Sequence, residues 1–203
     1  MATEDNLLLP REVTHPRLPA ETTWIALGDL SLLDATDFIP VILSRSLMPA
    51  KIDAETKRIA AAVRQGAVAV GGFISFAEKK AARQLASLPE LRLIRVLPHP
   101  LIDYPLTDAV RDRICKGRTL ILSGIGGTDK TLTRANCVRT NGWVLNICEA
   151  ATAPATPLPA QKPTPVVEAK QPPAPPPAPA PKQKSTPTPP APAPADDPAA
   201  IFL

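Results

Sequence analysis

The sequence has few of the residues that build metal sites or disulfide frameworks. Its 203 residues include three cysteines and two histidines, and no pair of cysteines has CxxC spacing. His15, His99 and these cysteines therefore cannot form a structural zinc site of the usual spacing. An odd number of cysteines without a pairing pattern instead predicts reduced thiols and a cytoplasmic location.

Long apolar runs are also missing. No run approaches the ~18 residues that a membrane span needs. The N-terminus, MATEDNLLLPREV, is acidic before its three leucines, which is the reverse of a secretory signal. We therefore expect no membrane partner. Aromatic residues make up only 3% of the chain, so few side chains are available to stack on nucleobases.

Residues 151–203 contain no Gly, Cys, Trp or Tyr but hold 18 of the 27 prolines. A segment of this composition cannot build a packed core, and we expect a disordered, extended tail. Residues 1–150 have the right length for one domain. We divide them into an N-terminal extension, 1–20, and a domain, 21–150.

The tail ends in an acidic and apolar tip, ADDPAAIFL, that is similar to the tip of bacterial single-stranded-DNA-binding proteins. Its charged and apolar residues are Asp196, Asp197, Ile201, Phe202 and Leu203. We predict that this tip docks a recombinase or a repair or replication protein. The alternative is that three apolar residues merely follow a disordered tail.

Positive charge is concentrated in the predicted domain. Residues 1–37 carry two basic and seven acidic side chains, whereas residues 38–150 carry 17 basic and 9 acidic ones, a net of +8. A body of this charge suits a polyanionic partner such as nucleic acid. Many such surfaces are simply solvated, so charge alone does not decide the function.

The stretch GIGGTDKT, Gly124 to Thr131, resembles a nucleotide-binding P-loop at first sight. A P-loop needs glycine immediately before its lysine, because the backbone must press its N–H groups onto phosphates. Here that position is Asp129, which adds a Cβ and a negative charge. The chain after Thr131 is also too short for a magnesium-binding acidic strand. We therefore expect no P-loop and no bound cofactor.

Short apolar runs alternate with helix-like segments from residue 38 onward. The runs expected to be strands are Phe38–Ser44, Ala67–Gly72, Leu91–Leu97, Thr119–Gly124 and Trp143–Ala150. Asp53, Ser75 and Thr107 are the expected caps of the first three intervening helices, with Ser75 and Glu78 spaced as a capping box. A weaker helix is expected over TRANCVRT. This alternation predicts a Rossmann-like three-layer α/β sandwich with a mostly parallel sheet.

Five segments that together span most of the predicted domain resemble the DprA/Smf family of DNA-processing proteins. They are WIALGDLSLLD, VILSRSLMPA, AVAVGGFISFAEKKAARQL, LIRVLPHPLIDYP and LTRANCVRTNGWVLNICEA. The resemblance implies binding of single-stranded DNA and loading of a recombinase. It carries over Ser44, Arg45, Gly72 and Arg134; the family's RNR signature is degraded, and Arg139-Thr140-Asn141 is a rival register for it. For the oligomeric state, a homodimer is an open alternative to a monomer.

The residue types at the expected sheet edge suit phosphate. Arginine offers a bidentate fork, hydroxyls donate, glycines allow close backbone approach, and a helix N-terminus presents N–H groups. The predicted phosphate-binding residues are Ser44, Arg45, Ser46, Gly71, Gly72, Ser75, Lys130, Arg134, Asn136 and Arg139. Ser75 and Glu78 can equally be a plain helix cap, and Phe73 and Phe76 are interpreted as core.

An enzymatic alternative comes from the wider superfamily. Cytokinin-activating phosphoribohydrolases carry a GGxGTxxE loop with a catalytic Glu, and GIGGTDKT is similar to it but lacks both the second glycine and that Glu. No acid–base pair converges elsewhere, as general acid–base catalysis would need. We therefore favour a non-enzymatic DNA-binding protein and keep a small-nucleotide binder or nucleotide hydrolase as the alternative.

Overall fold

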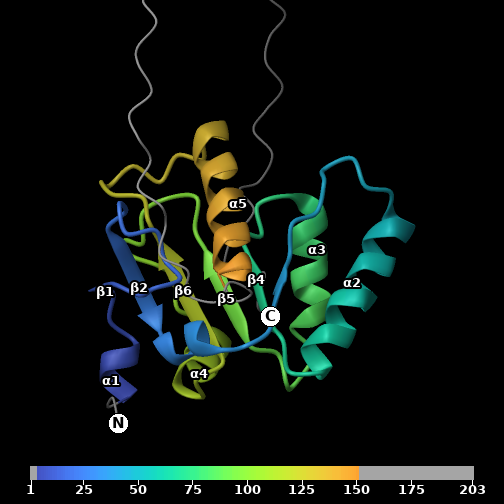
Figure 1. Cartoon of the computed structure of the whole chain (residues 1–203), viewed down its shortest axis with the longest axis horizontal. Coiled ribbons are helices and arrows are strands. Elements are labelled where there is room, and N and C mark those ends of the chain that lie inside the picture. The colour runs from blue at the N-terminus through green and yellow to red at the C-terminus, as the bar shows by residue number, and fades with distance from the viewer. Residues whose placement is uncertain (1–3, 151–203) are drawn as a thin grey trace, which may run out of the picture. The chain divides into compact units, whose positions relative to one another are not determined.

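A computed structural model describes residues 4–150. They contain a six-stranded sheet with strand order β1-β2-β6-β5-β4-β3 (Figure 1). The four parallel strands are β3 (Phe38–Pro40), β4 (Val68–Gly71), β5 (Leu93–Val96) and β6 (Thr119–Ser123). The predicted α/β sandwich with a mostly parallel sheet is confirmed. The proline-rich segment 151–203 lies outside the described residues, and the predicted domain boundaries stay predictions.

Two antiparallel strands that the sequence patterns did not reveal complete the sheet. β2 (Trp24–Gly28) pairs antiparallel with β6, and β1 (Arg11–Val13) pairs antiparallel with β2. Gly28 ends β2 at φ +112°, and a Cβ there would meet the backbone of Thr119. This position therefore requires glycine, because only glycine adopts that φ without strain.

Helices cover both faces of the sheet. The helices are α1 (Glu4–Leu7), α2 (Pro49–Arg64), α3 (Phe76–Leu85), α4 (Asp108–Cys115) and α5 (Arg134–Glu149), with a 3₁₀ turn, η1, at Leu30–Asp34. Residues of α2, α3 and α4 share one buried cluster, and residues of α5 and η1 share the other. Figure 1 shows α5 lying across the strands, with α2 and α3 beside each other.

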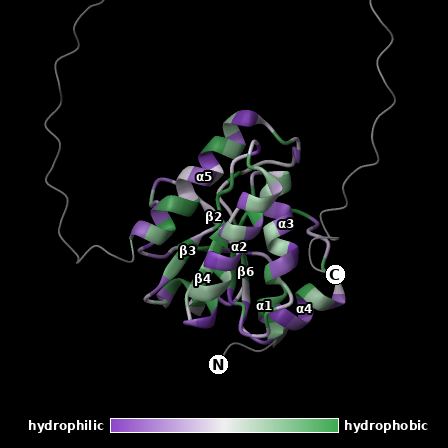
Figure 2. Cartoon of the chain, turned by 90° about the vertical axis from the view of Figure 1, so that its right-hand side faces the viewer, coloured by the Kyte–Doolittle hydropathy of each residue, from purple (hydrophilic) through white to green (hydrophobic). Residues whose placement is uncertain are grey.

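The inner strands β4, β5 and β6 are buried along their whole length and are mostly apolar, because helices cover both of their faces. In β4, Val68 and Val70 pack in the cluster under α5, whereas Ala69 packs in the cluster under α2 and α3. In Figure 2 the strands are mostly green, while the helices around them carry purple positions. The sheet is therefore the middle layer of the fold. It fixes the positions of the loops that leave the ends of its strands.

Several local signals are confirmed. Ser75 and Glu78 form the predicted capping box at the start of α3, and the Thr107 side chain caps α4. Pro40 is the last residue of β3, an edge strand, where its missing N–H breaks no ladder bond.

Two predictions about the elements were wrong. Trp143–Ala150 is no strand; it continues the helix expected over TRANCVRT, so that α5 runs unbroken from Arg134 to Glu149. Its buried residues Cys137, Thr140, Val144 and Ile147 recur at helical spacing. Asp53 caps no helix, because α2 begins four residues earlier at Pro49, where proline's fixed φ suits the first helical position.

Candidate nucleic-acid site

Two adjoining cavities lie beyond the carboxyl end of β3. One has a volume of about 420 Å³ and is lined by residues 42–45, by Ile74, Ser75 and Glu78, and by Cys137 and Asn141. The other, of about 710 Å³, is lined by Arg45 and by residues of the segment 132–141. Arg45, Cys137 and Asn141 line both cavities, so we treat them as one groove, called the Arg45 groove below.

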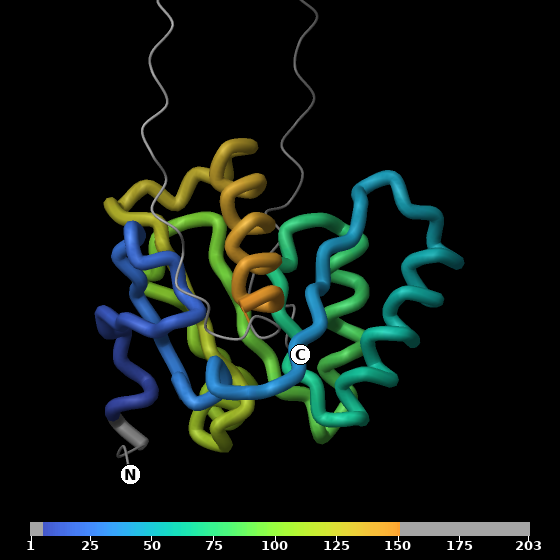
Figure 3. The backbone as a smooth tube through the Cα atoms, viewed as in Figure 1, coloured from blue at the N-terminus to red at the C-terminus, as the bar shows by residue number. Residues whose placement is uncertain are grey.

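Segments far apart in the chain form this groove. Residues 41–48 leave the edge strand β3 and run between α3 and α5 before α2 begins, as the tube in Figure 3 shows. The Val41 N–H donates to the Val70 carbonyl at 2.7 Å, which holds the segment against β4. The groove thus lies where parallel α/β sheets bind ligands, outside the carboxyl ends of their strands.

Arg45 and Arg134 supply the positive charge of the groove. Both side chains are exposed, and within residues 4–150 neither takes part in a hydrogen bond or an ion pair. Arg45 lies in the loop after β3, and Arg134 is the first residue of α5. Two free guanidinium groups on one groove can each bind a phosphate in bidentate fashion.

The serines beside Arg45 hold the loop and are themselves exposed. The hydroxyls of Ser44 and Ser46 lie 2.9 Å apart, and the Ser46 N–H donates to Ser44 Oγ at 3.3 Å. This is a local turn of the kind that serines favour. Ser44 lines the smaller cavity together with Arg45, as the sequence predicts.

Glu78 occupies the helix N-terminus that we expected to face phosphate. Its side chain is 3% exposed. The Leu43 N–H donates to Oε1 at 3.1 Å, and the N–H groups of Ile74 and Ser75 donate to Oε2 at 2.7 and 3.1 Å. A carboxylate of the protein therefore holds the position that an anion would take. These N–H groups are not available to a ligand.

The Ser75 hydroxyl is likewise engaged in hydrogen bonds within the protein. Its hydroxyl donates to the Leu43 carbonyl at 3.0 Å and accepts from the Glu78 N–H at 3.1 Å. The capping box therefore joins α3 to the loop that carries Arg45. It holds this loop against the start of α3.

Gly71 and Gly72 are buried and line neither cavity. A Cβ on Gly71 would lie 3.0 Å from the Val41 carbonyl, and one on Gly72 would lie 3.0 Å from Thr140 Cγ2 of α5. The structure thus shows these glycines packing the neighbouring chain segments closely.

The N-terminal half of α5 forms the opposite wall of the groove. The Thr133 side chain caps the helix by accepting from the Asn136 N–H at 3.1 Å. Arg134, Cys137, Val138 and Asn141 share the face that lines the groove, as their spacing of three and four residues requires. Asn136 is half-buried, and Lys130 lies exposed in the preceding loop; neither lines the groove.

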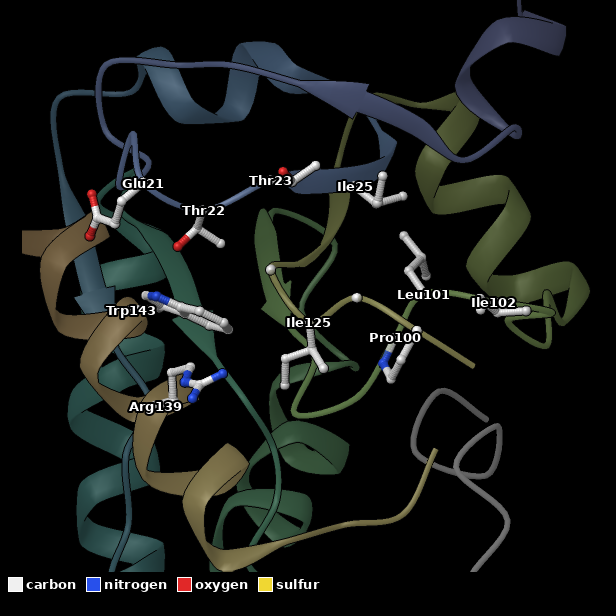
Figure 4. Close-up of a pocket in the computed structure, with 13 residues that line it drawn as sticks. Glu21, Thr22, Thr23, Ile25, Pro100, Leu101, Ile102, Ile125, Arg139 and Trp143 are labelled. Atoms are coloured by element: carbon white, nitrogen blue, oxygen red, sulfur yellow. The ribbon is translucent and has the colours of Figure 1, made fainter. Parts of the chain in front are cut away.

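Arg139 belongs to a different cavity, on the other side of α5. That cavity measures about 780 Å³ and is lined by residues 21–23, 100–102 and 124–127 together with Ile25, Arg139 and Trp143. Figure 4 shows Arg139 beside Trp143 at one end, with Leu101 and Ile102 at the far end. The structure therefore does not bring Arg139 together with Arg45.

The glycine-rich loop lies on this second cavity. Asp129 Oδ1 accepts the Thr131 N–H at 2.8 Å in a local turn, and hydrogen bonds from Thr131 lower the pKa of the Asp129 carboxyl. α5 begins at Arg134, so no helix opens directly after Lys130 as it does in a P-loop.

The two phenylalanines near the groove differ. Phe73 is 2% exposed and belongs to the core, as expected. Phe76, which was also interpreted as core, is 74% exposed at the first turn of α3. It precedes the buried Ala77, and the helix turns its side chain to solvent. Phe76 follows Ser75, which lines the groove, but does not line either cavity itself.

The sequence analysis named Asn141 only within the rival register Arg139-Thr140-Asn141, and the structure places it in the lining of both parts of the groove. Among residues 4–150 its buried Oδ1 has no hydrogen-bond partner. The signal was its place seven residues after Arg134, which puts both on one helical face. Reading the end of α5 as a strand obscured that relation.

The described part of the chain offers little else of chemical note. Residues 4–150 contain no group of three or more His, Cys, Asp or Glu that could hold a metal ion. No helix in this part is long and apolar enough to cross a membrane. Burial raises the pKa of the Cys148 thiol to about 12, so this cysteine is a poor nucleophile.

Comparison with known proteins gives a likeness in fold. No family model and no curated protein sequence matches the chain. Among solved structures, the fold is similar to that of DNA processing protein A from Helicobacter pylori, with a TM-score of 0.53 and 19% sequence identity. The match covers 70% of this chain and 66% of that one, just under two thirds. That structure is described for its unique single-stranded DNA binding mode. The resemblance noted in the sequence is thus confirmed at the level of fold.

Proposed function

We propose that this protein binds single-stranded DNA in the Arg45 groove and catalyses no reaction there. The observation that carries the proposal is the meeting of Arg45 and Arg134, from distant parts of the chain, on one groove with no ion-pair partner among residues 4–150. An unpaired guanidinium is a natural ligand for a phosphodiester. The similar fold of a protein described as binding single-stranded DNA supports the same function.

The helix dipole of α5 also favours phosphate binding in the groove. Arg134 is the first residue of this 16-residue helix, whose N-terminus carries the positive end of the helix dipole. A phosphate between Arg45 and Arg134 therefore gains from two guanidinium groups and the dipole. Such backbone contacts bind DNA of any sequence.

Apolar side chains at the groove suit bases. Phe76, Leu132 and Val138 are 74%, 54% and 64% exposed, and the latter two line the larger cavity. Bases splayed out from a single strand would cover these surfaces, whereas a duplex keeps its bases stacked inside. The groove therefore favours single-stranded over double-stranded DNA. A role in recombination or DNA uptake is the finer part of the proposal.

The groove offers no free acid or base among residues 4–150. Glu78 is the only carboxylate of this part of the chain that lines it, and both of its oxygens accept backbone N–H groups. The loop that is similar to the phosphoribohydrolase motif lines the cavity on the other side of α5. No observation favours the nucleotide-hydrolase alternative, and we propose a binding protein.

The test is a salt titration of oligonucleotide binding. Replacing Arg45 and Arg134 with alanine should reduce the slope of log K against log[salt] by about 0.7 for each phosphate that the variant no longer neutralises. The matched control replaces Arg83 and Arg111, exposed arginines elsewhere on α3 and α4, and removes the same charge. Equal slopes for both double variants would show that the groove is not the site.

The predicted partner-docking tip, Asp196 to Leu203, lies outside the described residues. Docking of a recombinase or of a repair or replication protein there stays a prediction, as does a homodimer. A peptide of residues 192–203 tests the tip. Binding to such a partner that survives Phe202→Ala would refute the apolar anchor.

A further inference from the structure

We infer that Asn141 binds the hydrogen-bonding edge of a nucleobase in the 420 Å³ part of the Arg45 groove. The protein would then read bases as well as phosphates. The inference rests on the proposed function, because the base belongs to the strand whose phosphates Arg45 and Arg134 hold. It adds a recognition element that the two arginines cannot supply.

The first observation is the unpaired oxygen. Asn141 Oδ1 is buried, and within residues 4–150 it accepts no hydrogen bond. Buried polar atoms in folded proteins are nearly always paired, and leaving one unpaired costs stability. A bound ligand that donates an N–H to this oxygen would remove that cost.

The second observation is the cavity around the amide. Ile42, Leu43 and Ile74 give it apolar walls, and Asn141 lines it from α5. Its volume of about 420 Å³ lies within the ~300–1,000 Å³ typical of small-molecule sites. Arg45 lines both this cavity and the larger one. A nucleotide with its phosphate on Arg45 can therefore direct its base toward Asn141.

Two other polar side chains of the cavity wall, Ser75 and Glu78, are already engaged within the protein. Glu78 accepts three backbone N–H groups, and the Ser75 hydroxyl bonds to the Leu43 carbonyl. Asn141 has an amide with one acceptor and two donors. Because Oδ1 is buried, the inference requires a rotation about Cβ–Cγ that turns this oxygen toward the ligand, and the broad χ2 torsion of Asn permits such a rotation. Base edges carry the matching donors and acceptors.

The experiment compares two oligonucleotides with identical phosphates. One is oligo-dT of about 15 nucleotides, within the usual range of single-strand sites; the other carries a methyl group on every thymine N3. The methyl group removes the N3–H donor and keeps the ring and the backbone. We expect the full chain to bind the unmodified strand about five- to tenfold more tightly, the factor of one neutral hydrogen bond.

Variants assign the difference to Asn141. Asn141→Leu should bind both strands equally, near the affinity of the wild type for the methylated strand. Asn146→Leu, an exposed position on the same helix, should keep the wild-type ratio. Because Asn141→Leu deletes an unpaired buried oxygen, its Tm should not fall. Equal binding of the two strands with an unlowered Tm therefore identifies a binding role.

The outcomes separate the two proposals. Tight binding of both strands by the wild type with equal affinity overturns the role of Asn141 and leaves the DNA-binding function standing. Absence of binding to either strand overturns both. A ratio that persists in Asn141→Leu assigns base reading to another residue and also overturns the inference. Equal binding of the two strands by the wild type overturns the inference even if Asn141→Leu does not fold.

Discussion

Replacing Glu78 with alanine should lower the free energy of unfolding, because this side chain holds the loop that carries Arg45. The Glu78 carboxylate is 3% exposed and accepts the N–H groups of Leu43, Ile74 and Ser75. Alanine leaves these three donors without their partner and removes half of the capping box. Each hydrogen bond to a charged group contributes about 1.5–3 kcal/mol. Because water and relaxation recover part of this energy, we expect a net destabilisation of about 3–5 kcal/mol.

Urea unfolding followed by circular dichroism measures this destabilisation. Glu55→Ala is the control, since Glu55 carries one exposed ion pair, to Arg58 at 2.9 Å, and should change the free energy of unfolding by less than about 1 kcal/mol. Glu78→Gln keeps one acceptor oxygen and should fall between the two. A cost below about 1 kcal/mol for Glu78→Ala would refute the reasoning that the carboxylate holds the Arg45 loop.

Three further predictions use other parts of the structure. Gly28→Ala should cost about 2–4 kcal/mol in urea unfolding, because φ is +112° and the new Cβ meets the neighbouring strand; Gly126→Ala, with open space around it, should cost less than about 0.5 kcal/mol. Cys148, with its pKa raised to about 12 by burial, should resist alkylation at about pH 8, near the usual thiol pKa, until the protein unfolds, as peptide mass spectrometry would show; rapid native labelling would contradict this. Burial raises the pKa of Tyr104, the single tyrosine, above its usual 10.0, and Arg95 opposes that shift. Ultraviolet titration should therefore show a raised midpoint, and because the folded state keeps the proton longer, stability should fall as the pH rises above about 10.

The fold could be predicted because the parallel strands carry strong local signals. β4 to β6 are short apolar runs between helices with recognisable caps such as Ser75 and Thr107. The antiparallel pair β1 and β2 gave no such signal. Arg11–Val13 is three residues long, too short for a visible alternation, and its place in the sheet depends on pairing with distant segments.

The site could be predicted only in part. Ser44, Arg45 and Arg134 line the groove as expected. The glycines after β4 pack against neighbouring segments, and Glu78 fills the helix N-terminus, because both features depend on which side chain comes closest in three dimensions. Asn141 required knowing that α5 is continuous.

The antiparallel pairing of β2 with β6 also has a consequence for how the chain folds. Ile25 lies opposite Ser123, so this pairing closes a loop that includes the whole β3–β6 unit. Closing so long a loop carries a large entropic cost, which is offset only once its contacts form. On the ribosome, β2 must wait until β6 has emerged from the exit tunnel. In pulse-labelled hydrogen exchange during refolding, the amides of β2 should therefore become protected after those of β4 and β5.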